Sequence, residues 1–399
     1  MRILVVASTL PYPPVSGFRI RVFQLVQFLA RRHHLSIVAF GGEGDAAKIA
    51  ALSQVCSDVR VVPGLEASRR AKRIGQLLSI LRPTSYQRTS LYAPQMQQAL
   101  DELCAGEPFD VIQVESSHLA APYRFDSRSR LVVAEHDIVY ELLHRMFKTE
   151  RSLFRRLYNW REYAKFKGEE IELWRRASAV VATSLREVPI VEAAAPGTRV
   201  HSAANGVDVD YFCPSDAVPE PHSVVMTGLL STRPNIDAVT WFVGEVMPRL
   251  LAVHPDTVFY AVGGEPADEV RSLASSKVVV TGAVDDVRPY VYRSAVFVVP
   301  MRMGGGTRLK VMEALAMRKP LVSTSLGCEG IDVVEGADLL VADDAAGFAD
   351  AVLRLFEDRE LGARLAAHGH EVVRATYRWE TIADGLEAFY ESLIATDGR

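Results

Sequence analysis

Residues 296–316 read VFVVPMRMGGGTRLKVMEALA. The apolar, β-branched residues 296–300 predict the end of a buried strand, the glycines after them predict a loop, and the residues from 307 onward predict the start of a helix. Strand–loop–helix units of this kind build parallel sheets that carry helices on both faces. The stretch therefore predicts an α/β fold.

The same alternation of short apolar runs and longer helical segments extends in both directions. One series of predicted strands precedes the stretch, at Ile3–Ala7, Leu35–Phe40, Val111–Val114, Leu131–Ala134 and Val180–Thr183, with a helix near Arg19–Arg32. A second series consists of Val224–Thr227, Val258–Val262, Val278–Thr281, Val296–Pro300, Leu321–Ser323 and Leu339–Val341. We expect two Rossmann-like, doubly wound domains whose strand ends face a central cleft.

The boundary between the two series is predicted at Ala204–Pro221, where an Asn-Gly pair and three prolines interrupt the pattern. The chain has 399 residues, which is too long for a single core and suits two domains. We therefore expect domains at 1–204 and 205–379.

Composition narrows the class of protein. Residues 1–200 carry 28 Lys and Arg against 20 Asp and Glu, whereas residues 201–399 carry 17 against 29. The basic residues form no compact patch, so nucleic acid is not an expected partner. The four cysteines are far apart and form no metal-ligand motif, and the chain opens on a predicted strand rather than on a signal peptide. We expect a cytoplasmic protein with no structural zinc and no membrane-spanning helix.

The glycine loop predicts an anion site. Gly304, Gly305 and Gly306 allow close approach of a ligand to the backbone, and the free N–H groups of the following helix attract phosphate. Thr307 is the expected N-cap, Arg308 and Lys310 add positive charge, and Glu313, about two turns into the helix, suits the hydroxyls of a ribose. An ordinary glycine turn before an amphipathic helix remains the alternative.

A second predicted helix start follows the strand Val224–Thr227. There a glycine turn leads to Arg233, Pro234 and Asn235, again a helix N-terminus beside a cation. Two such sites in one domain suggest a diphosphate. Taken alone, Arg233 would be an ordinary surface arginine.

Two further candidates lie in the first domain. The proline-rich loop 8–17 ends at Gly17, which allows close approach to a ligand, and His136 follows directly after a predicted strand. An imidazole there could bond a sugar hydroxyl or position an acceptor, although a strand-end histidine between two acids is also a common structural residue.

The chain resembles the group 1 glycosyltransferases, the family 4 retaining nucleotide-sugar enzymes with the GT-B fold, over essentially its whole length. Four segments carry the resemblance: the loop ending in Gly17, Glu135-His136-Asp137, Asn205–Asp208 with Tyr211–Pro214, and Gly304–Ala316.

The resemblance implies roles for these residues. Glu313 matches the second glutamate of the E-x7-E motif and binds ribose, Arg233 and Lys310 lie near the donor diphosphate, and His136 faces the donor sugar. Further donor contacts are implied for Asn235, Gly306, Thr307 and Arg308, and for Val284 near the base. The first glutamate of the motif is replaced by Gly305, which leaves the contact with the transferred sugar open. The C-terminal helix, 380–399, is expected to pack back on the first domain.

The resulting hypothesis is transfer of a sugar, with retention, from a nucleotide diphosphate donor to a glycan or lipid-linked acceptor in cell-surface polysaccharide or glycolipid biosynthesis. No cofactor and no metal are expected. Segments 68–82 and 144–167 combine cations with apolar residues at helical spacing, which is typical either of peripheral contact with the inner face of a membrane or of solvated helices. The alternative function, suggested by Gly305, is a catalytically silent nucleotide-binding subunit that supports a partner enzyme.

Overall fold

The computed structural model describes residues 1–64, 69–150, 152–304 and 307–395. The chain divides into two compact units. Unit 1 comprises Met1–Ala204 with Ile382–Arg399, and unit 2 comprises Asn205–Thr381.

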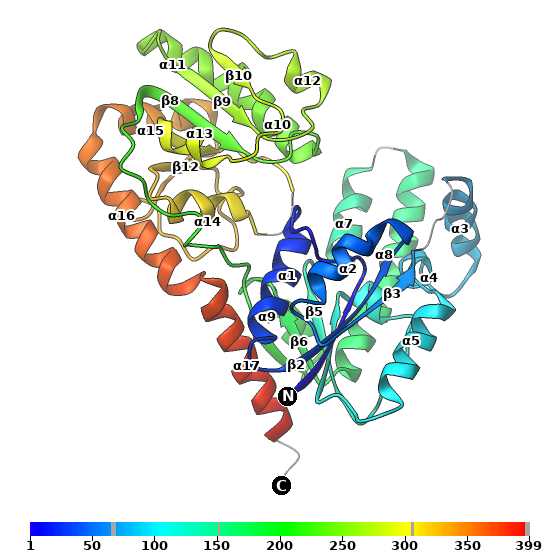
Figure 1. Ribbon diagram of the computed structural model, residues 1–399. Helices are drawn as coiled ribbons and strands as arrows, with labels where there is room; N and C mark the ends of the chain where they lie inside the picture. Colours follow the sequence, from blue (N-terminus) through cyan, green and yellow to red (C-terminus); the bar gives the residue numbers. More distant parts are fainter. Residues whose placement is uncertain (65–68, 151, 305–306, 396–399) are drawn as a thin grey trace. The chain divides into compact units, whose positions relative to one another are not determined.

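Unit 1 is built on a seven-stranded sheet in the order β3-β2-β1-β4-β5-β6-β7, and every neighbouring pair is parallel. Figure 1 shows helices on both faces of this sheet. The strands are β1 (Arg2–Ala7), β2 (His34–Gly41), β3 (Asp58–Pro63), β4 (Val111–Glu115), β5 (Arg130–Glu135), β6 (Ala179–Ala182) and β7 (Arg199–Ser202). The helices are α1 (Gly17–Leu29), α2 (Ala46–Leu52), α3 (Arg69–Leu81), α4 (Tyr86–Ser90), α5 (Pro94–Cys104), α6 (Ser117–Ala120), α7 (Val139–Thr149), α8 (Leu153–Arg176) and α9 (Val188–Ala194).

Unit 2 repeats the architecture with a six-stranded parallel sheet in the order β10-β9-β8-β11-β12-β13. Its strands are β8 (Glu220–Thr227), β9 (Val258–Val262), β10 (Val278–Val280), β11 (Ser294–Val299), β12 (Leu321–Ser323) and β13 (Leu340–Val341). Its helices are α10 (Arg233–Trp241), α11 (Met247–Val253), α12 (Asp268–Arg271), α13 (Arg288–Arg293), α14 (Leu309–Ala316), α15 (Ala345–Glu357) and α16 (Arg359–Thr376), and a π-helical turn, Phe242–Val246, joins α10 to α11.

The central strands are buried on both faces, as in other doubly wound sheets. Ile3, Leu4 and Val6 in β1 are each 0% exposed. A continuous apolar run suits such a strand, because helices cover both sides of a parallel sheet and leave no solvent-facing row. The prediction of two doubly wound α/β domains is confirmed.

The strand order reverses once in each sheet. In unit 1 the chain moves outward from β1 to β2 and β3, and then returns to place β4 on the other side of β1. In unit 2 the corresponding reversal places β8 beside β11. Open parallel sheets bind ligands outside the carboxyl ends of the strands at such a reversal. These two edges are therefore where a site is expected.

The last helix, α17 (Trp379–Ala395), contributes its residues from Ile382 onward to unit 1. Arg32 Nη2 forms ion pairs with Asp384 and Glu387, at 2.5 and 2.8 Å. The Tyr390 hydroxyl, fully buried, donates to Gln113 Oε1 in β4. The C-terminal helix is thus tied to a central strand of the first sheet. None of the helices in the described ranges is both long and apolar enough to span a bilayer.

Candidate donor site and strand-end network

The loop between β11 and α14 begins the candidate site of unit 2. Gly305 and Gly306 lie outside the described residues. The helix begins at Leu309 with Arg308 as its N-cap residue, and no side chain caps the first turn. The prediction that Thr307 is the N-cap is wrong, because the backbone stays extended through Arg308. Glu313 consequently lies about one turn into the helix rather than two. The uncapped N–H groups of the first turn are the kind of groups that bind an anion.

Lys310 and Glu313 lie one turn apart on α14, so their side chains share a face of the helix. Lys310 Nζ donates to Asn235 Oδ1 at 2.9 Å, which links α14 to α10. Burial lowers the pKa of Lys310 to about 8, and Glu313 partly opposes this. Burial likewise raises the pKa of Glu313 to about 7, and Lys310 partly opposes the rise. At neutral pH the site holds a partly buried ammonium and a partly buried carboxyl group close to its titration point.

Glycines with positive φ follow four consecutive strands of this sheet. They are Gly228 after β8, Gly263 after β9, Gly282 after β10 and Gly304 in the loop after β11, with φ of 147°, 151°, 72° and 117°. Each turns the chain out of its strand in a conformation that side chains disfavour.

The turns after β8 and β9 lie so close together that no side chain fits between them. A Cβ atom on Gly263 would lie 1.8 Å from the Gly228 carbonyl oxygen, and one on Gly228 would lie 2.8 Å from Lys310 Nζ. The glycines therefore let the backbone approach these polar groups directly.

The remaining candidates of unit 2 surround the same edge. Asn235 is buried, and its Nδ2 donates to the Leu229 carbonyl oxygen at 2.8 Å, which fixes the amide for its bond to Lys310. Arg233 is exposed at the first position of α10. Arg308 is only 7% exposed, and its Nη2 lies 3.3 Å from the Cβ position of Gly304.

Val284 is partly buried in the loop after β10. This loop is held beside the turn after β9, because Thr281 Oγ1 accepts a hydrogen bond from the Gly263 N–H at 3.3 Å. The described candidates of unit 2 thus gather along the carboxyl ends of β8 to β11.

In unit 1 the strand reversal brings together β1, β4 and β5. Gly17 is exposed and begins α1, after β1. His136 follows β5, and its Nε2 lies 2.7 Å from Glu115 Oε2 at the end of β4. The Phe18 ring packs on the imidazole with centroids 4.8 Å apart. The predicted histidine therefore has a buried carboxylate partner.

Glu115 was not among the sequence candidates. It is 1% exposed, and although burial opposes its ionisation, bonds with His136 and Gln113 hold its pKa below the ordinary value. Gln113 Nε2 donates to Glu115 Oε1 at 2.5 Å and connects the pair to Tyr390 of α17. A polar residue at the end of a buried strand was the only signal in the sequence. The neighbouring Glu135 is fully buried and instead accepts hydrogen bonds from Ser117 and Trp174 inside the core.

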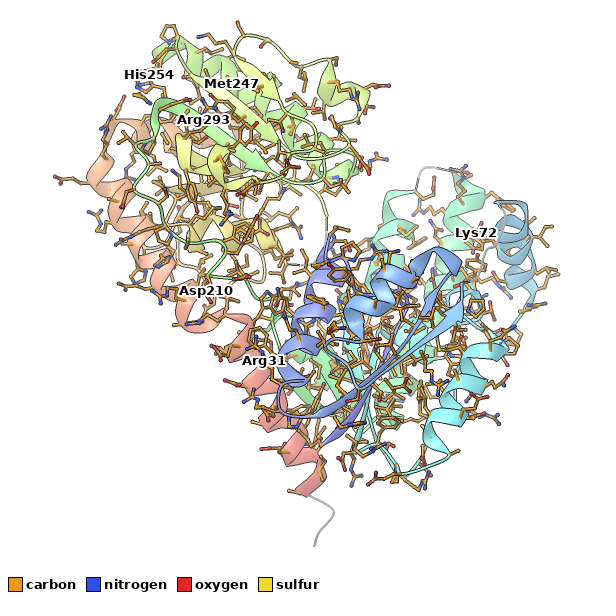
Figure 2. The ribbon with its side chains drawn as sticks, viewed as in Figure 1. Arg31, Lys72, Asp210, Met247, His254 and Arg293 are labelled. Carbon is orange, nitrogen blue, oxygen red and sulfur yellow. The ribbon has the colours of Figure 1, made fainter. Side chains whose placement is uncertain are left out.

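Among the described residues, one cluster could hold a metal ion: His222, His254 and Asp256, whose ligand atoms lie within 4.8 Å of one another. Figure 2 labels His254, which directly follows α11 in unit 2 as its C-cap residue. The two imidazoles stack with centroids 3.8 Å apart and planes 18° apart, and His222 Nδ1 lies 2.9 Å from Asp256 Oδ2. The cluster adjoins the start of β8, the opposite edge from Lys310. The expected absence of a metal at the donor site stays a prediction.

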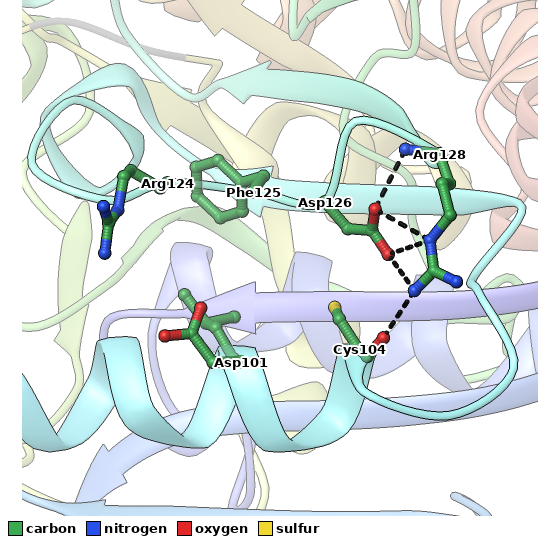
Figure 3. A pocket seen from close by; sticks show the side chains of 7 residues that line it. Asp101, Cys104, Arg124, Phe125, Asp126 and Arg128 are labelled. Atoms are coloured by element: carbon green, nitrogen blue, oxygen red, sulfur yellow. Dashed lines mark hydrogen bonds and ion pairs between the residues drawn. The ribbon is translucent and has the colours of Figure 1, made fainter.

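A small hollow in unit 1, of about 240 Å³, lies between α5 and the segment before β5. Figure 3 shows the bonds of Arg128 in this hollow: it pairs with Asp126 at 2.8 Å and donates to the Cys104 carbonyl oxygen at 2.7 Å. These bonds fasten the loop to α5. The hollow includes none of the candidate residues.

Two family models match this chain in succession. Residues 15–211 match the model described as Glycosyltransferase Family 4, and residues 221–358 match the model described as Glycosyl transferases group 1. The chain belongs to the group 1 glycosyltransferases. The two matches meet at 211–221, next to the boundary between the two units, so each covers most of one sheet of the GT-B fold.

Individual proteins are also similar to this chain. An uncharacterized 44.6 kDa protein in the cps region of Klebsiella pneumoniae is 22% identical over 94% of this chain and 96% of its own length. A Mycobacterium tuberculosis GDP-mannose-dependent alpha-(1-6)-phosphatidylinositol monomannoside mannosyltransferase is 24% identical over 75% of this chain and 88% of its own. The crystal structure of Anabaena HepE in complex with UDP and glucose superimposes with a TM-score of 0.68 at 17% identity, covering 98% of this chain and all of that one.

Proposed function

We propose that this glycosyltransferase moves a sugar, with retention at the anomeric carbon, from a nucleotide diphosphate sugar to a glycan or lipid-linked acceptor. The observation that carries the proposal is the pairing of Lys310 with Asn235 beside Glu313, at the carboxyl edge where β8 meets β11. A partly buried ammonium at an uncapped helix start is suited to a phosphate, and a carboxylate one turn further suits a diol.

In the proposed complex the donor diphosphate lies between the first turns of α10 and α14. Lys310 and the exposed Arg233 supply positive charge, and Glu313 accepts hydrogen bonds from the ribose hydroxyls. The loop of Val284 contacts the base. Thr307 and Arg308, just before α14, lie beside the phosphates.

The reaction breaks the bond between the anomeric carbon and the diphosphate oxygen, and forms a bond from the same carbon to the acceptor oxygen. The acceptor hydroxyl passes its proton to an oxygen of the departing diphosphate. Negative charge grows on the leaving diphosphate, and groups already oriented toward that position lower the barrier without reorganising. The ammonium of Lys310, whose pKa is about 8, is charged at neutral pH and supplies this stabilisation. The proposal therefore requires no metal.

His136 is proposed to bond a hydroxyl of the transferred sugar or the acceptor. Its Nε2 contact with Glu115 at 2.7 Å fixes the ring orientation, and Phe18 restricts rotation from the side. Glu115 is a positioning residue in this scheme, because it acts through the imidazole.

The names of relatives support an acceptor in the glycolipid or surface-polysaccharide class. The mycobacterial relative is named for transfer to a phosphatidylinositol monomannoside, and a Rhizobium leguminosarum relative is named as a lipopolysaccharide core mannosyltransferase. We propose that the reaction takes place in the cytoplasm, at the inner face of the membrane that carries such an acceptor.

The first test is thermal stabilisation by UDP, GDP, ADP and dTDP, since a ligand that binds only the folded protein raises its melting temperature. We expect one nucleotide to raise the midpoint of the wild type and of Glu360→Gln, a matched change on the exposed face of α16, but not of Glu313→Gln. The donor assignment fails if millimolar nucleotide produces no shift, or an equal shift in Glu313→Gln.

A second measurement addresses transfer itself. Release of nucleoside diphosphate from the matching nucleotide sugar should require the acceptor. Nucleotide binding without release in the presence of glycolipid acceptors would contradict the enzymatic role and favour a silent binding subunit.

A further inference from the structure

Large apolar side chains are exposed together on three helices of unit 1. Of the eighteen large hydrophobic residues that are exposed in the described parts of the chain, ten lie on α3, α7 and the first turns of α8. The most exposed of them are Leu81, Leu153, Phe154 and Leu157, at 84%, 81%, 66% and 62%. Monomeric proteins rarely expose so many neighbouring apolar residues without a partner for them.

The exposed residues follow helical spacing, so each helix presents one apolar stripe. On α8, Leu153, Leu157 and Trp160 are four and three residues apart, and α3 shows the same three- and four-residue steps between Ile74 and Leu81. A stripe of this kind normally faces a core. Here the stripes face outward, and we call them together the apolar face of unit 1.

Helix α8 explains why this face does not pack on the sheet. The helix has 24 residues and is therefore about 36 Å long. Its second half lies against the sheet, where Trp174 is 0% exposed, and its first half continues beyond the sheet beside α7 and α3. Figure 1 shows α3, α7 and α8 grouped at one end of unit 1.

Buried polar bonds hold α3 and α8 in this arrangement. Glu162, only 2% exposed, accepts a hydrogen bond from Ser79 Oγ at 2.9 Å. Lys165 Nζ donates to the Ser79 carbonyl oxygen at 2.7 Å. The helix pair is thus fixed by contacts behind the apolar face, and the face is preformed.

The charges described around the apolar face are mostly positive, and the acid of α7, Glu141, is paired with Arg145 and Arg186 at 3.6 and 3.0 Å. Residues 153–161 contain three Arg and no acid, and α3 adds Lys72. Lys72, Arg155, Arg156 and Arg161 are exposed, and Figure 2 labels Lys72 on α3. Two copies of such a face would repel each other, whereas a negatively charged surface would be attracted.

We propose that the apolar face binds a bilayer rich in anionic lipid, with the stripes of α3, α7 and α8 inserted at the interface and the cations at the phosphate level. Apolar helices flanked by Lys and Arg bind membranes in this way without spanning them. Helix α7 begins at Val139, three residues after His136, so the face adjoins the strand-end edge of unit 1. An acceptor anchored in that bilayer would reach the edge without leaving the membrane.

The test is co-sedimentation of the full chain with vesicles of phosphatidylcholine alone or of phosphatidylcholine mixed with phosphatidylglycerol. We expect binding to the mixed vesicles, weakened by salt, and at least about tenfold weaker binding of the double variant Phe154→Ser with Leu157→Ser. The matched control is Val253→Ser with Val334→Ser, two exposed residues of unit 2, which should bind like the wild type. The tryptophan fluorescence emission should shift to shorter wavelength when mixed vesicles are added. This shift should be absent in the variant Trp160→Phe.

Nucleotide-dependent thermal stabilisation of each variant reports separately on the donor site, so the membrane proposal and the proposed function can fail independently. Equal binding of the Phe154 and Leu157 double variant and the wild type, or no binding to mixed vesicles, would overturn the membrane proposal. A dimer in solution that the same substitutions dissociate would also overturn it, because the face would then belong to a second copy.

Discussion

Replacement of Lys310 by methionine is expected to make the ligand-free protein more stable while removing its affinity for nucleoside diphosphate. Burial lowers the pKa of Lys310 from 10.5 to about 8. Since one pKa unit corresponds to about 1.4 kcal/mol, holding the charged ammonium in this site costs about 3 kcal/mol. Methionine has a similar length and carries no charge, so the variant avoids this cost.

Part of the gain is lost because methionine cannot donate to Asn235 Oδ1, a bond of 2.9 Å that contributes about 1 kcal/mol. The net stabilisation is about 1–2 kcal/mol, or a rise of a few degrees in the melting temperature of a domain of this size. The same change removes the charge that faces the diphosphate, and kcat should fall about 100-fold or more.

The effect should depend on pH in a defined direction. Below about pH 8 the folded wild type carries the charged ammonium, and its free energy of unfolding is lowered by the full amount. Between about 8 and 10.5 the folded protein releases this proton while the unfolded chain keeps it, so the wild type gains stability as pH rises. The difference in melting temperature between the variant and the wild type should therefore shrink from pH 7 to pH 10.

Differential scanning calorimetry without ligand at pH 7 and pH 10 checks this. A variant that is less stable than the wild type at pH 7, or a difference that does not change with pH, would refute the argument that burial of charge at this site opposes folding.

Nucleoside diphosphate affinity measured by titration calorimetry should decline below about pH 7, as Glu313 gains a proton, and Glu313→Gln should remove that decline. Gly263→Ala should lower the free energy of unfolding by about 3 kcal/mol or more in urea titrations, because the new Cβ would lie 1.8 Å from a backbone oxygen of the neighbouring turn at a φ of 151°. Glu115→Gln should reduce kcat about tenfold or more in the transfer assay and leave nucleotide affinity unchanged, because the carboxylate acts only through His136.

Each of these has a control or a contrary result. Gly244→Ala is the control for Gly263→Ala, since a Cβ atom on Gly244 would meet nothing within 4 Å. If Glu115→Gln weakened nucleotide binding, the carboxylate would act on the fold or the donor rather than on the imidazole. If Glu313→Gln kept the acidic decline, another group, including the diphosphate itself, would be its source.

Local sequence predicted the central strands well. The predicted strands Val258–Val262 and Leu321–Ser323 have the same ends as β9 and β12. Continuous apolar runs mark them because both faces of these strands are buried. The strands β3 (Asp58–Pro63) and β7 (Arg199–Ser202) were missed, since both lie at edges of the sheet and contain charged or polar residues.

The site was predicted one loop at a time. Spacing identified the turn before Arg233, the glycine loop and Glu313, because each depends on a few consecutive residues. It placed the start of α14 one residue too early, since a threonine after glycines is a common cap and nothing local showed that the chain stays extended through Arg308. Glu115 was missed because a single carboxylate after an apolar run carries no distinguishing pattern.

The sequence by itself determined two α/β halves, the glycine turns at their strand ends and the types of residue available there, because these follow from the order of neighbouring residues along the chain. Tertiary structure alone decided that β8 lies beside β11 and β4 beside β1 and β5. That order brings Lys310 to Asn235 and His136 to Glu115, at 2.9 and 2.7 Å. Strand order depends on where each crossover helix packs, which is a property of the whole core, and burial, which sets the pKa of Lys310 and Glu313, exists only after that core has formed.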